Sequence, residues 1–319
     1  MTQLKFGQQG VALITAILIV VLATTAAVAM ATRQQLDVKR TANIFNADQA
    51  YLAALGGEDY ARNLLDTDRK DNQIDYLEED WAQPVVFPFE DMVLGGQMED
   101  MQGRFNLNNL LGDNDKPDAK YLAYFQRLLE VLDLDAAIAD AVIDWMDQNT
   151  AVHGFNGAED DYYMQLNPPY RAANRFMTSA SELLLVADMD QEKYARLAPF
   201  VTALPRQIDQ QPAYQTTAIN ANTAPAAVLA ALHPQLTLAD GEDMVETRKE
   251  DQFTSRDDFE NRSGIKSKNL TIDVSVDVVS NYFMLNASAE FDEARSQVYS
   301  LLKHEANGVR VVMRGRGAY

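Results

Sequence analysis

The feature that most constrains this chain is a charge-free apolar run close to its N-terminus. From Val11 to Ala31, 21 consecutive residues carry no charged side chain, and most are Val, Ala, Leu or Ile. A helix needs about 20 such residues to cross the hydrocarbon core of a bilayer. An export signal normally has a shorter apolar core before its cleavage site. The length of the run favours a retained membrane anchor, and a cleaved secretory signal remains the alternative.

The leader before this run is polar, carries one lysine, Lys5, and ends at Gly10. A glycine directly before a hydrophobic run resembles the type III (prepilin) signal of the type IV pilin and pseudopilin superfamily. The resemblance implies that residues 1–10 are a leader peptide, which prepilin peptidase removes between Gly10 and Val11. Val11 would then become the N-methylated first residue. Because the cut precedes the apolar run, the anchor survives processing.

The fifth residue after this junction is Thr15, where the superfamily usually has glutamate. An ionised group at that depth in lipid is costly unless it is paired, and the usual proposal is that the terminal amine of the neighbouring subunit pairs with it. A subunit at the tip of a filament has no neighbour ahead of it, whereas a threonine can bond to its own helix. The missing glutamate therefore predicts a tip subunit, and a degenerate signal is the alternative.

Charge and composition narrow the function classes. With 27 basic and 47 acidic residues the net charge is −20, which disfavours nucleic-acid binding and suits divalent cations. The chain has no cysteine, so disulfides and thiolate metal sites are excluded. With the lysine-bearing leader in the cytoplasm, we expect a single-pass protein of the inner membrane, whose soluble part lies in the periplasm of a Gram-negative bacterium.

The pattern beyond the anchor predicts an α+β fold. Apolar residues recur at helical spacing as far as residue 66, so we expect one helix over residues 11–66, with residues 11–31 in the membrane. Alternating segments in 67–108 and 271–319 predict a small antiparallel sheet, with Gly95-Gly96 as a hairpin turn. A long helix packed on such a sheet is the pseudopilin scaffold.

Between the strands lies a helical insert, predicted at residues 109–270. It contains a weak internal repeat, in which NLNNLL (Asn106 to Leu111) and NANTAPAAVLAAL (Asn220 to Leu232) are each followed by helices and a Phe-x-Thr/Ser segment. Ser, Thr and Asn stand where helix N-caps are needed. We expect two related bundles, about 109–204 and 216–270, that resemble SAM-like or helix-hairpin-helix modules.

Three further segments resemble the minor pseudopilin K family of type II secretion systems: QAYLAALGGEDYARNLL, GAEDDYY and PPYRAANR. The resemblance covers nearly the whole chain. It implies a non-enzymatic subunit that caps the tip of the pseudopilus, initiates its assembly with I-like and J-like minor pseudopilins, and supports protein export across the outer membrane. Exported proteins and the secretin channel are further expected partners.

The loop between IDWMDQN and PPYR is rich in carboxylates. Such groups repel one another unless a cation lies among them, and Ca²⁺ accepts six to eight oxygen ligands in flexible geometry. A loop of about 20 residues between helices is also unusual unless something holds it. We therefore expect a calcium site, with a solvated acidic loop as the alternative. The candidate ligands are Asp144, Asp147, Glu159, Asp160 and Asp161.

Two other function classes stay open. A DNA-uptake or type IV pilus-like minor pilin could use a helix-hairpin-helix module on DNA, but the segment LHPQLTLADGEDM has no Gly-x-Gly hairpin and places acidic residues where phosphates would lie. A plain single-pass periplasmic binding protein with an uncleaved anchor is the other. For an enzyme such as a glycosidase, nothing beyond paired carboxylates gives support.

Overall fold

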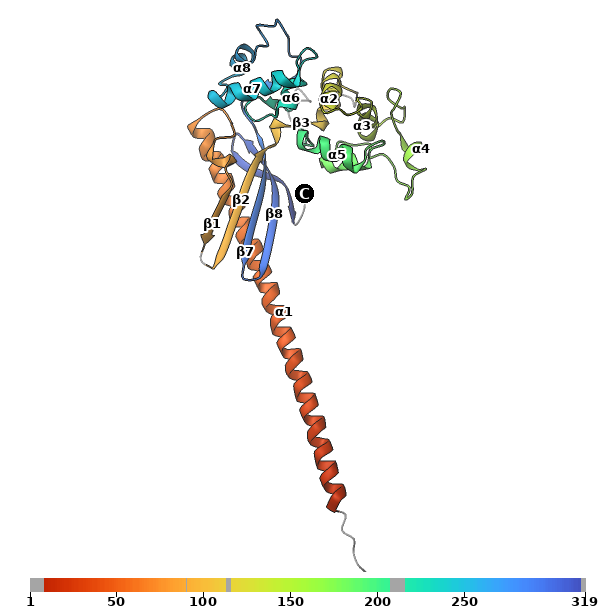
Figure 1. The fold of residues 1–319 in the computed structure, drawn as a ribbon, viewed down its shortest axis with the longest axis vertical. Coiled ribbons are helices and arrows are strands. Elements are labelled where there is room, and N and C mark those ends of the chain that lie inside the picture. Colours follow the sequence, from red (N-terminus) through yellow and green to blue (C-terminus); the bar gives the residue numbers. More distant parts are fainter. Residues whose placement is uncertain (1–8, 90, 113–115, 207–215, 317–319) are drawn as a thin grey trace, which may run out of the picture.

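The computed structural model describes residues 9–89, 91–112, 116–206 and 216–316. Figure 1 shows three parts along one long axis: a helix that projects from the molecule, a sheet against its upper half, and a helical insert beyond the far end of the sheet. The helix, α1 (Gln9–Asp71), is unbroken over 63 residues, which corresponds to about 95 Å. It continues past residue 66, where the sequence pattern predicted its end.

The lower part of α1 contacts no other part of the described chain. Its apolar side chains are exposed, from Val11 at 63% to Met30 at 71%, and it contains the one candidate membrane span among the described residues. Thr24 and Thr25 bond back to Val20 and Val21 oxygens, which satisfies their hydroxyls without water. Exposed apolar residues over this length are stable in lipid rather than in water.

The scaffold sheet has five antiparallel strands in the order β1-β2-β7-β8-β9. This confirms the predicted α+β pseudopilin fold and the three C-terminal strands. β2 and β7 are adjacent in space although the whole insert separates them in the sequence (Figure 1). The strands are β1 (Val85–Phe89), β2 (Met92–Asp100), β7 (Tyr282–Phe291), β8 (Ala294–Glu305) and β9 (Gly308–Arg316).

The predicted turn at Gly95-Gly96 is wrong. Both glycines lie inside β2, where Gly96 pairs with Val85 and Gly95 with Val86, and the chain reverses between β1 and β2. A Cβ on Gly95 would lie 2.9 Å from Oγ of Ser288 on β7. The glycine therefore allows close approach of a neighbouring strand, which is a common reason for glycine within a sheet.

The upper part of α1 packs on one face of the sheet through small side chains and one buried charge. Ala50, Ala54 and Ala61 are buried against it. Glu58, 3% exposed, accepts hydrogen bonds from Arg314 Nε at 2.9 Å and Nη2 at 2.6 Å, and also from Ser300. Burial raises the pKa of Glu58, but the bonds from Arg314 and Ser300 and the Arg314 charge hold it below its usual value.

The insert is longer than predicted at both ends. β2 ends at Asp100 and β7 begins at Tyr282, so the insert comprises residues 101–281, whereas the sequence predicted 109–270. Each module has one short parallel pairing, β3 (Phe105–Asn106) with β4 (Val201–Thr202) and β5 (Ile219–Asn220) with β6 (Val276–Asp277). The main helices are α2 (Ala119–Val131), α3 (Ile138–Met146), α4 (Asp160–Tyr163), α5 (Gln191–Leu197), α6 (Ala226–Ala230), α7 (Leu238–Glu250) and α8 (Arg256–Arg262).

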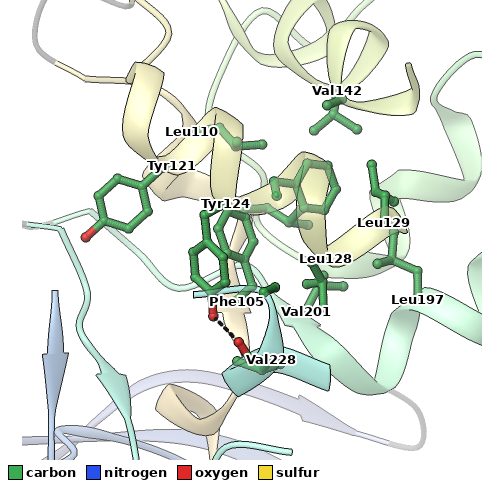
Figure 2. Packing of buried hydrophobic residues seen from close by; sticks show 14 of the residues in the cluster. Phe105, Leu110, Tyr121, Tyr124, Leu128, Leu129, Val142, Leu197, Val201 and Val228 are labelled. Atoms are coloured by element: carbon green, nitrogen blue, oxygen red, sulfur yellow. Dashed lines mark hydrogen bonds between the residues drawn. The ribbon is translucent and has the colours of Figure 1, made fainter. Parts of the chain in front are cut away.

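Short 3₁₀ helices complete the described chain. They are η1 (Asp80–Ala82), η2 (Met101–Gly103), η3 (Leu107–Leu110), η5 (Ala180–Leu185) and η6 (Ala198–Phe200). One hydrophobic core extends through both modules (Figure 2). In it Phe105 stacks on Phe125, with ring centroids 5.1 Å apart, and the Tyr124 hydroxyl donates to the Val228 carbonyl oxygen at 2.9 Å. The two modules are therefore packed as one body.

The internal repeat is visible in equivalent hydrogen bonds. Asn108 donates to the Met177 oxygen and accepts from the Met177 N–H, both at 2.9 Å. Asn222 does the same with Phe253, again at 2.9 Å. Each asparagine side chain thus makes the two hydrogen bonds to a backbone residue that a neighbouring strand would make. Shortly after that residue, a helix begins with a serine N-cap, Ser179 or Ser255.

A substitution at Glu58 tests how α1 is fixed on the sheet. In Glu58→Gln the charge-assisted bonds to Arg314 are lost, and we expect unfolding to become easier by about 1.5–3 kcal/mol. The measurement is urea unfolding of the full chain in detergent micelles. Asp59→Asn, an exposed neighbour, is the control and should change stability by less than about 0.5 kcal/mol. Equal effects of the two variants would contradict the assignment.

Candidate functional site

The N-terminal junction is accessible in the described part of the chain. α1 begins at Gln9, so Gly10 and Val11 already have helical backbone, and Gly10 has open space around it. The hydroxyl of Thr15 donates to the Ala12 oxygen at 3.0 Å. A side chain at this position therefore needs no partner from another subunit, unlike a carboxylate.

The acidic loop forms a second site, at the outer end of the first module (Figure 1). α3 carries Asp144 and is followed at once by Asp147, and Glu159 is the residue before α4. All three side chains are buried, with exposures of 0%, 2% and 5%. The loop thus folds back on its helix and brings these carboxylates to the interior.

Several carboxylate oxygens in this site lack a hydrogen-bond donor. Asp144 Oδ1 accepts from the His153 N–H at 2.9 Å, but Asp144 Oδ2 and both Glu159 oxygens have no partner among the described residues. Buried carboxylates without donors are strongly unfavourable unless they are neutralised or bind a cation. Asp147 differs, because Asn149 donates to both of its oxygens.

The backbone at Gly157 lies close against these oxygens, where no other residue would fit. A Cβ there would lie 2.1 Å from Asp144 Oδ2 and 2.4 Å from the His153 backbone oxygen. Asp144 Oδ2 and the His153 carbonyl oxygen therefore lie close together beside the backbone of Gly157. Hard oxygen donors of both kinds are the ligands that Ca²⁺ takes in proteins, so the residues present fit such an ion.

The electrostatics point the same way. Burial, and then the charges of Asp144, Asp147 and Asp160, raises the pKa of Glu159 to about 7. Burial, and then Asp147, raises the pKa of Asp144 to about 6, against the hydrogen bond from His153. A carboxyl group with a raised pKa in the folded state stabilises the protein at low pH, and this stability is lost as the pH rises from about 4 through that pKa. A bound divalent cation would remove this penalty.

The remaining two candidates lie further out. Asp160 is partly buried, accepts from the Ala172 N–H at 3.1 Å and pairs with Arg171 at 3.7 Å. Asp161 is exposed on the first turn of α4. The structure therefore buries Asp144, Asp147 and Glu159 near enough for their charges to interact, but does not bring ligand oxygens of all three within 4.8 Å of one another; Asp160 is partly buried beside them and Asp161 is exposed.

One neighbouring carboxylate was missed by the sequence reasoning. Asp140 lies 3.9 Å from Nε2 of His153, and a Cβ on Gly154 would overlap its carboxylate. Asp140 and Asp144 are at i and i+4, which puts them on one face of α3, and Asp147 directly follows the end of that helix. That spacing was available in the sequence as a signal.

Aromatic residues hold the loop in place. Tyr163 is buried, lies edge-on to Trp145 with centroids 5.3 Å apart, and accepts from the Ala187 N–H at 3.1 Å. The Tyr170 hydroxyl donates to the Leu185 oxygen at 2.9 Å. Burial raises the pKa of Tyr163, so its hydroxyl stays neutral. These contacts explain the order of a long loop.

The helix-hairpin-helix-like part of the second module is closed to anions. At the start of α7, Asp240 accepts from the Thr237 N–H at 2.8 Å and from its hydroxyl at 2.7 Å, and it pairs with Lys268. Arg248 is buried and donates to the Ala221 and Ala224 oxygens. The cap and the one buried cation of α7 are thus used internally, which opposes phosphate binding there.

The long apolar N-terminal helix, the five-stranded antiparallel sheet and the helical insert at the far end of that sheet together define a pseudopilin. Comparison with known proteins gives the particular family. Family models described as "Type II secretion system (T2SS), protein K" match residues 103–206 and 219–278, one for each helical module. The chain belongs to the type II secretion system protein K family, and it is a minor pseudopilin of such a system.

Relatives and a solved structure agree with this assignment. A type II secretion system protein K from Pseudomonas aeruginosa is 35% identical over 98% of this chain and 94% of its own length. The Klebsiella pneumoniae protein is 34% identical over 98% and 97%. The crystal structure of the GspK–GspI–GspJ complex from enterotoxigenic Escherichia coli contains a chain that is 25% identical, with a TM-score of 0.72 over 88% of this chain and all of that one.

Proposed function

We propose that this protein caps the tip of a type II secretion pseudopilus and initiates its assembly with two other minor pseudopilins, I-like and J-like. The observation that carries the proposal is the place of the insert. It lies beyond the end of the scaffold that is furthest from the anchor (Figure 1), where a further subunit would have to be added. A filament with this subunit at its end therefore cannot be extended beyond it.

The anchor supports the same role. Thr15 meets its hydrogen-bonding needs within its own helix, so the chain needs no subunit ahead of it. No catalytic step is required, because capping and assembly depend on shape and binding alone. The insert leads the filament, so exported proteins and the secretin channel are the partners that it would meet first.

The upper part of α1 offers a surface for the sister subunits. Leu52, Gly56 and Tyr60 lie at four-residue spacing on α1, and Leu52 and Tyr60 are 58% and 54% exposed, with the Tyr60 ring at the edge of the sheet, 6.5 Å from that of Phe87 on β1. A Cβ on Gly56, between them, would meet no other atom within 4 Å, so this position leaves a notch for close helix approach. A partner anchored in the same membrane would bring its own helix alongside this surface.

Filling the notch tests the assembly role. The Cβ of the new side chain in Gly56→Leu would meet no other atom within 4 Å, and leucine favours a helix by somewhat less than the about 0.8–1 kcal/mol that separates Gly from Ala, so the variant should fold. We expect its binding to co-expressed I-like and J-like subunits, measured by co-purification in detergent, to weaken at least about tenfold. Gly56→Ala is the matched control and should still assemble. An unchanged complex with Gly56→Leu would exclude this surface.

Capping itself needs a filament readout. Deleting the insert residues 101–281 removes the obstruction, so the proposal expects longer pseudopili and fewer of them when the variant replaces the natural chain. Electron microscopy of sheared filaments gives their length and number. Filaments of unchanged length and number would contradict a role at the tip.

We also propose that the buried acidic group binds calcium. Asp144 and Glu159 would supply side-chain oxygens and the His153 carbonyl a backbone oxygen, with Asp147 and Asp160 close by. The ion would fix the loop on α3 by neutralising these carboxylates, and it would supply no chemistry beyond that. The oxygens without donors and the glycine beside them support this assignment.

Calcium should therefore raise the melting temperature of the full chain at pH 8. At a free concentration 100 times the dissociation constant, binding adds about 2.7 kcal/mol, and the gain should shrink below pH 6 as the carboxyl groups take up protons. Glu159→Gln should lose the response, but melt higher than the natural chain when EDTA is present. Asp161→Asn, outside the buried group, should keep the response. No shift with calcium would defeat the proposal.

Processing is the remaining proposal. We expect prepilin peptidase to cut between Gly10 and Val11 on the cytoplasmic side of the inner membrane, leaving N-methylated Val11 on a chain whose body lies in the periplasm. Intact-mass spectrometry of the membrane fraction should give this mature N-terminus, and Gly10→Asp should leave residues 1–10 attached. A mature chain that starts at Met1 or beyond Ala31 would contradict the assignment.

A further inference from the structure

A second group of acidic side chains lies where α1, the loop after it and the second module meet. Carboxylate oxygens of Asp68, Asp75 and Glu79 all lie within 4.8 Å of one another. Asp75 and Glu79 are buried and Asp68 is partly so. Asp100, buried at the end of β2, faces Asp75. The joint between scaffold and insert therefore contains four carboxyl groups.

Positive charge at this joint is scarce. Among the described residues, the cation paired with the group is Arg69, whose Nη2 lies 3.1 Å from Asp75 Oδ2. One guanidinium cannot offset four ionised carboxylates in a buried place. Asp68 also lies in the last turn of α1, where the helix dipole disfavours a negative charge. At least one of these groups must hold a proton near neutral pH.

Hydrogen bonds indicate where that proton lies. Glu79 accepts from Asn72 Nδ2 at 2.6 Å, from the Tyr76 N–H at 3.0 Å and from Trp81 Nε1 at 2.6 Å, so both of its oxygens already have donors. Carboxylate oxygens of Asp68 and Glu79 lie within 4.8 Å of each other, and after burial and the Glu79 charge a hydrogen bond to Glu79 also raises the pKa of Asp68. Because two carboxylates are acceptors only, such a bond needs a proton on one partner. The donors that fill the Glu79 lone pairs also distinguish this group from the calcium site.

We propose that Asp68 and Glu79 share a proton that closes the joint between scaffold and insert, and that losing it at higher pH loosens the joint. The loop containing Asp75 and Glu79 connects directly to the insert. Asp75 accepts through its backbone oxygen from Asn220 Nδ2 at 3.0 Å, and through Oδ2 from the Ser280 N–H at 2.7 Å. Repulsion within the acidic group would therefore act on the bonds that hold the second module.

The pH range follows from the burial of the two aspartates. Burial, and then the charge of Glu79, raises the pKa of Asp68 to about 7. Burial raises the pKa of Asp75 to about 7 as well, against Arg69 and the Ser280 N–H. Each group holds its proton more tightly when folded, so its stabilisation is complete below about pH 4 and disappears as the pH rises through about 7.

Other charges face the joint from each element packed on it, and they set the background for any titration. Buried Asp100 also has a raised pKa, mainly from burial. Those on α1 and the following loop are Asp66, Arg69, Lys70, Asp71, Tyr76, Glu78 and Asp80, and those from β8 and α7 are His304 and Arg248. A useful experiment must therefore compare variants at each pH instead of following the natural chain alone.

The test is the melting temperature of the full chain in detergent from pH 4.5 to 8.5, in EDTA. Asp68→Asn keeps a donor for Glu79 but cannot ionise. We expect it to match the natural chain at pH 4.5 and to melt higher at pH 8 by about 2–4 °C. Hydrogen exchange over residues 72–79 and 219–223, corrected for intrinsic rates, should rise with pH in the natural chain and not in the variant.

Asp71→Asn is the matched control, because it removes the same charge from the same end of α1 without touching the shared bond. Its effect at pH 8 should be much smaller than that of Asp68→Asn, because Asp68 and Glu79 can still repel each other in this variant. If Asp68→Asn behaved like this control, the proposal would be overturned. It would also fail if, in a Glu159→Gln background, calcium raised the melting temperature at pH 8 and Asp68→Asn removed that effect, since the group would then be a cation site. If Asp68→Asn does not fold, Glu79→Gln gives the comparison through its pH dependence alone, because it also loses a hydrogen bond from Asn72, or those from Tyr76 and Trp81, at every pH.

Discussion

The pairing of β2 with β7 fixes the arrangement of the whole molecule. These two strands are neighbours along their full length, so the chain leaves the sheet at Asp100 and returns at Tyr282 at nearly the same place. The insert between them is held by both of its ends at one end of the sheet. The strand topology therefore fixes the position of the insert on the sheet. The contacts of the small alanine side chains fix the sheet on α1, and so fix the insert relative to the membrane anchor.

The predictable parts of the fold are those in which contact with lipid, water or a packed face gives the sequence a regular hydrophobic pattern. The apolar run from Val11 needs lipid on every side, and the C-terminal strands alternate because one face meets α1. The Gly95-Gly96 pair was misread, because a glycine pair reports backbone freedom or close approach equally well. The ends of the insert were missed since residues 101–108 and 271–281 make short bridges and 3₁₀ turns with no period to detect.

The acidic sites show the same limit. Asp144, Asp147 and Glu159 could be grouped from the sequence, because Asp144 lies on α3, Asp147 directly follows α3 and Glu159 directly precedes α4. Asp140 was missed although its spacing on α3 places it on the same face. The group at Asp68, Asp75 and Glu79 gave no local signal. It forms because the loop after α1 turns back toward Ser280 and Asn220, which are about 200 and 150 residues away in the chain, and only the tertiary structure brings them together.

The part of α1 between the membrane span and the sheet is a bare helical stalk, exposed from residue 32 to residue 45. Successive residues on an α-helix are related by a rotation of about 100° and a rise of about 1.5 Å. The length of this stalk therefore sets both the rotation of the sheet and insert about the axis of α1 and their distance from the membrane. Removing a single residue would swing the sheet and insert by more than a quarter of a circle. Natural insertions or deletions in the stalk should therefore favour seven, eleven or eighteen residues, because these lengths return the sheet and insert to nearly the same rotation about the axis of α1.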